Sequence, residues 1–106
     1  LAVGFMVLVL LLVSAISAWE IAMLVERGRI ALAMDLDEWL QAVESLEGIA
    51  LVPVSAQLAV QSATLPGDFH KDPADRLIVA LAREQNAVLV TADDKIQRYP
   101  HVRWAW

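Results

Sequence analysis

The chain of 106 residues is long enough for one compact domain, and 58% of its residues are hydrophobic. It contains no cysteine, which excludes disulfide bonds and thiolate metal sites. The net charge of −5 excludes attraction to nucleic acid by bulk electrostatics. A role on nucleic acid therefore requires a local basic patch or metal ions bound to carboxylates.

The N-terminal segment, residues 1–19, carries no charged side chain and leaves two interpretations open. It is long and apolar enough to cross a bilayer, which takes about 20 apolar residues, but no Lys or Arg precedes it. Its run L-V-L-L-L-V-S-A-I is also typical of a strand buried on both faces. The following S-A-W-E fits a capping box, with Ser17 as N-cap and Glu20 at N3. We favour the strand, followed by a helix whose apolar side carries Trp19, Met23, Leu24 and Ile30.

The rest of the chain alternates between helix and strand patterns. The residues D-L-D-E-W-L-Q-A-V-E predict an amphipathic helix, because the apolar residues recur at helical spacing: Leu36, Trp39, Leu40 and Val43. The elements expected after it are a strand over 49–54, a helix over 55–65, a helix after Asp72, a strand over 87–91 and a strand over 102–106. This alternation predicts an α/β fold, a parallel sheet flanked by helices, in a single domain of residues 1–106.

The strongest helix start is D-P-A-D, with Asp72 as N-cap and Pro73 at N1. The side chains expected on the buried side of this helix are Leu77, Ile78, Leu81 and Ala82.

Three carboxylates are expected at one edge of the sheet. Glu20 follows the first strand, Asp75 lies in the first turn of its helix, and Asp93 follows the strand that ends at Thr91. In parallel α/β sheets, ligands bind at the edge where the strands end. Carboxylates that converge there repel one another unless a cation such as Mg²⁺ or Mn²⁺ lies between them. The alternative is that each acid only starts a helix or a turn.

Other polar and aromatic residues carry weaker signals. His70, alone in a loop, is more often structural or exposed to solvent than catalytic. Arg76 is a candidate for contact with phosphates or with a neighbouring carboxylate, although ordinary surface charge is the favoured interpretation. The four Trp residues are assigned to a core or an interface. The sequence contains no Ser/His/Asp triad pattern, no glycine-rich phosphate loop and no zinc-ligand spacing.

Three blocks together, S-A-I-S-A-W-E-I-A, F-H-K-D-P-A-D-R-L-I-V-A and L-V-T-A-D-D, resemble a PIN domain of the VapC toxin type. The resemblance covers residues 11–106. It implies a Mg²⁺-dependent (or Mn²⁺-dependent) cytoplasmic ribonuclease whose substrate is RNA, with tRNA and ribosomal RNA as the usual targets. It also implies neutralisation by a cognate antitoxin protein, and it leaves a homodimer open.

The resemblance assigns both the metal-binding and the catalytic roles to Glu20, Asp75 and Asp93, and a supporting role to the hydroxyl of Thr91. The family pattern, however, begins with a strand that ends in a metal-binding Asp, in an L-D-T-H-like motif. No acidic residue precedes Glu20 here. We therefore expect a PIN-like sheet that lacks the usual first strand, in a chain that is a fragment, has a misassigned start or is a degenerate copy. The role of residues 1–10 is left open.

Three functional hypotheses follow. The first, which we favour, is a Mg²⁺-dependent endoribonuclease toxin. The second is a catalytically impaired remnant that only binds an antitoxin, for which the helix carrying Trp39 offers an apolar surface. The third is a single-pass membrane protein that spans the bilayer with residues 1–19, although membrane association is not the favoured interpretation.

Overall fold

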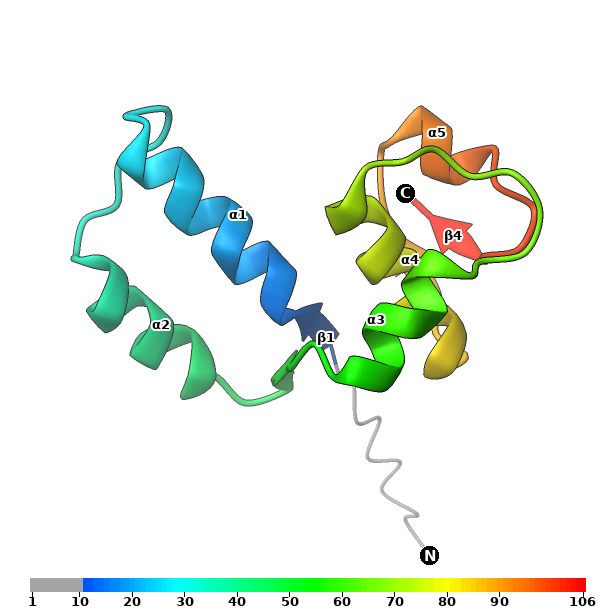
Figure 1. Cartoon of the computed structure of the whole chain (residues 1–106). Helices are drawn as coiled ribbons and strands as arrows, with labels where there is room; N and C mark the ends of the chain where they lie inside the picture. The colour runs from blue at the N-terminus through cyan, green and yellow to red at the C-terminus, as the bar shows by residue number, and fades with distance from the viewer. Residues whose placement is uncertain (1–10) are drawn as a thin grey trace, which may run out of the picture. The chain divides into compact units, whose positions relative to one another are not determined.

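A computed structural model describes residues 11–106, which form parts of two compact units (Figure 1). The first unit ends at Val52, and the second runs from Pro53 to Trp106. Each unit is described by itself. The expectations about residues 1–10 lie outside the described residues.

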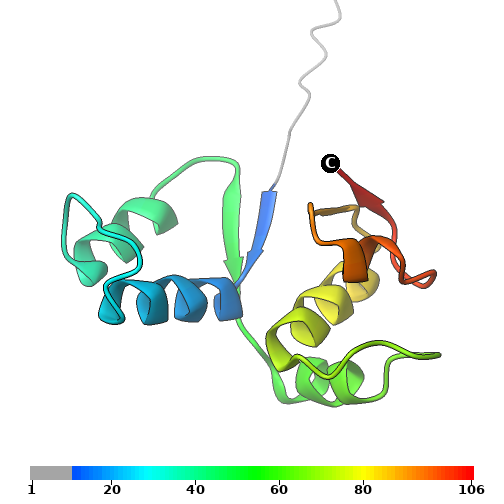
Figure 2. The same ribbon diagram turned by 90° about the horizontal axis from the view of Figure 1, so that it is seen from above.

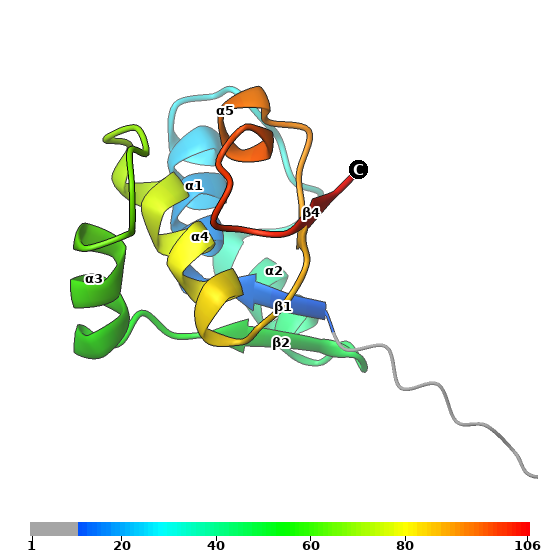
Figure 3. The same ribbon diagram turned by 90° about the vertical axis from the view of Figure 1, so that its right-hand side faces the viewer.

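The first unit contains two parallel strands joined by two helices. Its elements are β1 (Leu11–Ser14), α1 (Ala15–Glu26), α2 (Leu36–Glu44) and β2 (Ile49–Val52). Strands β1 and β2 lie side by side in Figure 3, with Leu11 opposite Ile49 and Ser14 opposite Val52. Parallel neighbours require a crossover connection, which the segment containing α1 and α2 provides. Strand β2 ends directly before Pro53, as expected for a residue that cannot donate a backbone hydrogen bond.

Helix α1 begins earlier than the sequence predicted. Its N-cap is Ser14, whose hydroxyl accepts a hydrogen bond from the backbone N–H of Ile16 at 3.2 Å. The prediction of Ser17 as N-cap was therefore wrong, and Glu20 lies in the second turn instead of at N3. Ser14 and Ser17 are one helical turn apart. The backbone is extended at Ser14, with φ −67° and ψ 140°, so the helix begins directly after it.

The end of α1 depends on Gly28, which has a φ of 69°. The N–H of Gly28 donates to the carbonyl of Val25 at 3.0 Å, and the N–H of Arg29 donates to that of Leu24 at 2.9 Å. These two bonds define a Schellman motif, in which the left-handed residue satisfies the last helical carbonyls. No atom outside its chain neighbours lies within 4 Å of a Cβ placed at Gly28, so glycine is required by the backbone conformation and not by space.

The predicted amphipathic face of α2 is confirmed. Asp35 caps the helix and accepts a hydrogen bond from Glu38 N–H at 2.8 Å. The helical residues that are half-buried are the four predicted ones, and all others in α2 are exposed. The predicted apolar side of α1 was wrong for Trp19 and Leu24, which are exposed, whereas Met23 is half-buried and Ile30 lies beyond the end of the helix. An almost wholly apolar helix gives no contrast from which its buried side can be inferred.

The second unit also contains two parallel strands. Its elements are α3 (Ala56–Ala63), α4 (Pro73–Glu84), β3 (Leu89–Val90), α5 (Asp94–Gln97) and β4 (Trp104–Ala105). Leu89 pairs with Trp104 and Val90 with Ala105, so both strands are shorter than predicted. Helices α3 and α4 pack against each other (Figure 2). Parallel strands and connecting helices in both units confirm the predicted α/β class.

The buried side chains gather in the second unit. Those beyond the start of α3 are Leu58, Leu65, Val79, Ala80, Leu81, Ala82, Ile96 and Tyr99, whereas Ser14 is the one buried residue between positions 11 and 52. The buried side of α4 is therefore centred on Val79 to Ala82, while the predicted Leu77 and Ile78 are only half-buried.

Three of the four tryptophans, Trp19, Trp104 and Trp106, are exposed and so are not core residues, and their assignment to an interface stays a prediction. Between residues 11 and 106, no helix combines the length and the apolar character that crossing a bilayer requires.

Candidate functional site

The first turn of α4 positions Asp75 through a cap that its own sequence encodes. The Asp72 carboxylate accepts hydrogen bonds from the N–H groups of Ala74, at 2.9 Å, and Asp75, at 3.2 Å. Pro73 occupies the first helical position, where no N–H is needed. The predicted start of this helix is confirmed, and it fixes the backbone from which the Asp75 side chain projects.

The Asp75 carboxylate contacts an imidazole. Its Oδ2 atom lies 3.0 Å from Nε2 of His70, and about a quarter of each side chain is exposed. The Nε2 atom itself is buried. The two groups form an ion pair when the imidazole is protonated. His70 is therefore a partner of the acidic site and not a solvent-facing loop residue.

Asp93 lies at the start of α5, where Thr91 and Lys95 contact it directly. Its carboxylate accepts a hydrogen bond from Lys95 N–H at 2.8 Å, and its own N–H donates to the Thr91 hydroxyl at 3.0 Å. Gln97 in turn donates to the carbonyl of Thr91 at 3.0 Å. The predicted supporting role of Thr91 thus has a geometric basis, because its hydroxyl fixes the backbone of Asp93.

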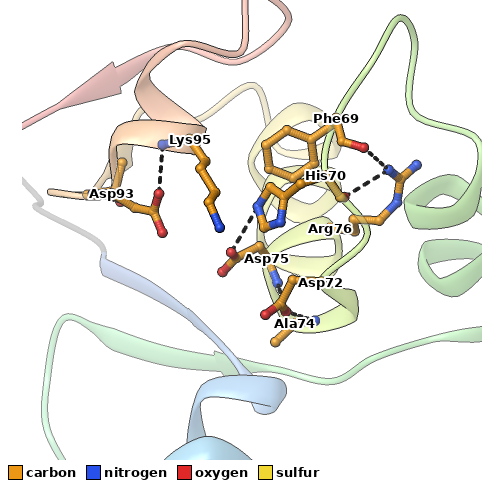
Figure 4. A network of polar contacts seen from close by, with 9 residues as sticks. Phe69, His70, Asp72, Ala74, Asp75, Arg76, Asp93 and Lys95 are labelled. Carbon is orange, nitrogen blue, oxygen red and sulfur yellow. Dashed lines mark hydrogen bonds and ion pairs between the residues drawn. The ribbon is translucent and has the colours of Figure 1, made fainter.

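The pKa of Asp75 depends on its burial and on the charges of neighbouring side chains. Burial raises the pKa of the Asp75 carboxyl above its ordinary value, and the negative charges of Asp72 and Asp93 raise it further. His70 and Lys95 act in the opposite direction and lower the pKa. In Figure 4 the Lys95 side chain extends toward Asp75. The second unit therefore places three carboxylates and two cationic or protonatable groups within electrostatic reach of one another.

Arg76 holds the loop that carries His70 through hydrogen bonds to backbone carbonyls. Its guanidinium donates to the carbonyls of Ser62 at 2.8 Å, Phe69 at 3.0 Å and His70 at 3.2 Å, with a longer contact to Ala63 at 3.4 Å (Figure 4). The partners of Arg76 are backbone carbonyls and not the carboxylate that the sequence suggested, while its contact with phosphate stays a prediction. Because the guanidinium is a planar fork of five donors, one side chain can join the end of α3 to the loop before α4.

Glu20 lies half-buried in α1 of the first unit. Asp75 and Asp93 are brought together in the second unit, and the convergence of Glu20 with them stays a prediction. Among residues 11–106, no group of three or more His, Asp or Glu side chains is arranged to hold a metal ion.

The chemistry of the acids nevertheless fits a hard cation. Mg²⁺ is commonly held through one or two carboxylates, with water completing its octahedral shell. Asp75 and Asp93 supply two such carboxylates. The pKa of Asp75 is raised first by burial and then by the negative charges of Asp72 and Asp93, and a bound cation would offset those charges.

The fold and the acidic site agree with the comparisons to known proteins. The PIN domain family model matches residues 7–102. The chain therefore belongs to the PIN domain family. It is 41% identical over 93 residues to Ribonuclease VapC22 of Mycobacterium tuberculosis, an alignment that covers 88% of this chain and 70% of that protein. The chain is thus a PIN domain protein of the VapC type. No solved structure matches the chain.

Sequence reasoning did not identify His70 and Arg76 as parts of the site. Both lie within F-H-K-D-P-A-D-R, beside acids that were identified. The proximity of His70 to D-P-A-D was the available signal, because a residue just before an N-cap lies near the first helical turn. Nothing in the local sequence indicated the carbonyl contacts of Arg76, since Ser62 lies 14 residues earlier in the chain.

Proposed function

We propose that this chain is a metal-dependent endoribonuclease of the VapC toxin type, with Glu20, Asp75 and Asp93 as its metal-binding and catalytic carboxylates. Family membership supports the reaction class, since the VapC relative is a ribonuclease. The observation that carries the proposal is the placement of Asp75 and Asp93 at the starts of α4 and α5 in the same unit. Burial first, and then the negative charges of Asp72 and Asp93, raise the pKa of Asp75.

Each residue of the site has a stated role in this proposal. A bound Mg²⁺ or Mn²⁺ would supply Lewis-acid stabilisation of the phosphodiester and lower the pKa of attacking water. Asp75 and Asp93 would hold the cation through carboxylate oxygens, together with Glu20. The Thr91 hydroxyl keeps the Asp93 backbone in place, and His70 restricts the orientation of the Asp75 carboxylate.

A cognate antitoxin protein is part of the proposal. Apolar side chains are exposed along the first unit, among them Leu11, Trp19, Leu24, Ile30, Met34 and Leu46. A protein partner would bury such side chains, in line with the binding role expected for the neighbouring α2 helix. A homodimer could cover the same side chains, and measuring the mass of the chain alone and with its antitoxin separates the two.

A second candidate function is antitoxin binding without catalysis. It is supported by the exposed apolar side chains of the first unit, which a protein partner would bury. This candidate predicts a stable complex with antitoxin and no RNA cleavage under any metal condition.

The deciding experiment is RNA cleavage by the full chain with Mg²⁺, with Mn²⁺ and with EDTA. Asp93→Asn should abolish cleavage, whereas Asp94→Asn, at the adjacent position of the same helix start, should retain it. Within α1, Glu20→Gln should abolish cleavage and Glu26→Gln should retain it. Folded protein that cleaves no RNA with either metal would favour the antitoxin-binding function, and cleavage that persists in EDTA would contradict metal dependence.

A further inference from the structure

A hollow of about 220 Å³ lies beside the acidic site in the second unit, lined by Asp68, Phe69, His70, Lys95, Arg98 and Tyr99. It adjoins Asp75 through His70, whose Nε2 atom contacts that carboxylate, and through Lys95, which lowers the pKa of Asp75. Sites for whole small-molecule ligands usually enclose about 300–1,000 Å³. The hollow therefore suits a smaller group, such as one nucleobase with its phosphate at the rim.

The aromatic wall of the hollow is rigid and suited to a planar ring. The Phe69 ring lies 4.5 Å from that of His70 and 4.7 Å from that of Tyr99, measured between centroids. Tyr99 is buried, and its hydroxyl donates to the carbonyl of Pro66. The ring planes are tilted by 58° and 45°, so these rings do not cover each other face to face. A nucleobase can stack on such a wall, and every base has a π-face that allows it.

The charged side chains complete the features of a nucleotide site. Lys95 and Arg98 are both exposed, and Arg98 is paired with Asp94. Lys95 is therefore the lining cation that we assign to an RNA phosphate, in a chain whose net charge is −5. Asp68 is the one carboxylate among the lining residues. A carboxylate accepts hydrogen bonds from the exocyclic amino group of cytosine, whereas uracil presents a carbonyl at that position.

We propose that this hollow binds one nucleotide of single-stranded RNA next to the acidic site. Phe69 and His70 stack on the base, Lys95 contacts a phosphate, and Asp68 favours cytosine over uracil. The proposal rests on the proposed ribonuclease function, and it adds the position and the base preference of a substrate nucleotide.

Binding without cleavage tests the site. The affinities of short, fluorescently labelled oligocytidine and oligouridine for the full chain are measured in EDTA over a range of salt concentrations. Lys95→Ala should weaken binding about five- to tenfold and lower the slope of log Kd against log salt by about 0.7, the value for one phosphate on a single strand. The matched control is Lys71→Ala, an exposed lysine of the same unit that does not line the hollow. General attraction between charges would weaken both variants equally, and that result would overturn the proposal.

Two further variants test the base contacts. Phe69→Leu should weaken binding about fivefold with an unchanged salt slope, because stacking is lost and charge is kept. Asp68→Ala should remove the preference for oligocytidine. Equal wild-type affinity for both oligonucleotides would overturn the role of Asp68. If Phe69→Leu does not fold, judged by its thermal midpoint, the exposed positions Lys95 and Asp68 decide the outcome.

The same experiment separates failure of the site from failure of the proposed function. The wild type is assayed for oligocytidine binding in EDTA and, separately, for RNA cleavage with Mg²⁺. A wild type that cleaves RNA while Lys95→Ala binds normally would overturn the nucleotide site alone. A wild type that binds through the hollow but never cleaves would overturn the ribonuclease function and support the site.

Discussion

The side chains of His70 and Asp75 contact each other at the acidic site, with 3.0 Å between Nε2 and Oδ2. The two residues lie on either side of the cap that begins α4, so the loop and the helix meet through this pair. An imidazole beside a carboxylate lowers the pKa of that carboxyl when the ring is protonated.

Replacing the imidazole should therefore change the titration of Asp75. At the acidic pH where a carboxyl group titrates, a histidine is protonated, so His70→Gln removes a positive charge. The pKa of the Asp75 carboxyl should rise further above its ordinary value, as measured by carbon-13 NMR of that carboxyl group. His101→Gln is the control, because His101 contributes nothing to the Asp75 shift. An unchanged or lower Asp75 pKa in His70→Gln would contradict the ion pair.

Ionisation of Asp75 should also lower the stability of the folded protein at neutral pH. Its pKa is raised from 3.8 in the folded protein, so the folded state holds the proton more tightly than the unfolded state does. Its stabilising contribution is therefore present below pH 3.8 and is lost as the pH rises through the folded-state pKa. Asp75→Asn, which cannot ionise, should have a higher thermal midpoint than the wild type at pH 7, and the difference should shrink toward pH 3.8.

The matched control for this prediction is Asp94→Asn. Asp94 pairs with Arg98 at an exposed position, where ion pairs contribute less than about 1 kcal/mol, so its replacement should not raise the midpoint. A lower midpoint for Asp75→Asn at pH 7 would show that the carboxylate stabilises the fold.

Arg76 should be far more important for stability than Arg83 on the same helix. Arg76 joins four carbonyls from two segments, whereas Arg83 donates to the single carbonyl of His101. Lysine cannot span several carbonyls, so Arg76→Lys should lower the free energy of unfolding by about 2–4 kcal/mol, and Arg83→Lys by about 1 kcal/mol or less. Urea denaturation measures both, and equal losses would exclude the joining role of Arg76.

Gly28 provides a test of the end of α1. Its φ of 69° lies in the left-handed region, which costs an L-residue about 1–2 kcal/mol. Gly28→Ala should destabilise the protein by about 1 kcal/mol, while Gly28→Asn should cost less, since asparagine tolerates this conformation. Circular dichroism during urea denaturation compares the variants. Because no atom crowds the Cβ position, a loss well above 2 kcal/mol would require a cause other than backbone strain.

Local signals in the sequence were sufficient for two parts of the structure. The start of α4 was predicted correctly, because Asp72 and Pro73 act within one turn of the chain. The half-buried face of α2 was predicted correctly, because its apolar residues recur at helical spacing among charged ones. Asp75 and Asp93 were identified as candidate site residues by their positions after a cap and after a strand.

The remaining features depend on distant parts of the chain. The choice between Ser14 and Ser17 as the cap of α1 follows from where β1 ends, which an uninterrupted apolar run does not reveal. The carbonyl contacts of Arg76 and the aromatic cluster around Phe69 form only after α3, α4 and α5 have packed. The exposure of Trp104 and Trp106 likewise follows from the position of β4, not from residue type.

The uneven distribution of buried side chains has a consequence for local unfolding. The N–H groups of α4 lie in the segment that holds most of the core, so their exchange with deuterium should require nearly global unfolding. Helices α1 and α2 contain no buried residue, so their N–H groups should exchange through smaller openings. We therefore expect α1, which carries Glu20, to unfold locally more often than α4, which carries Asp75.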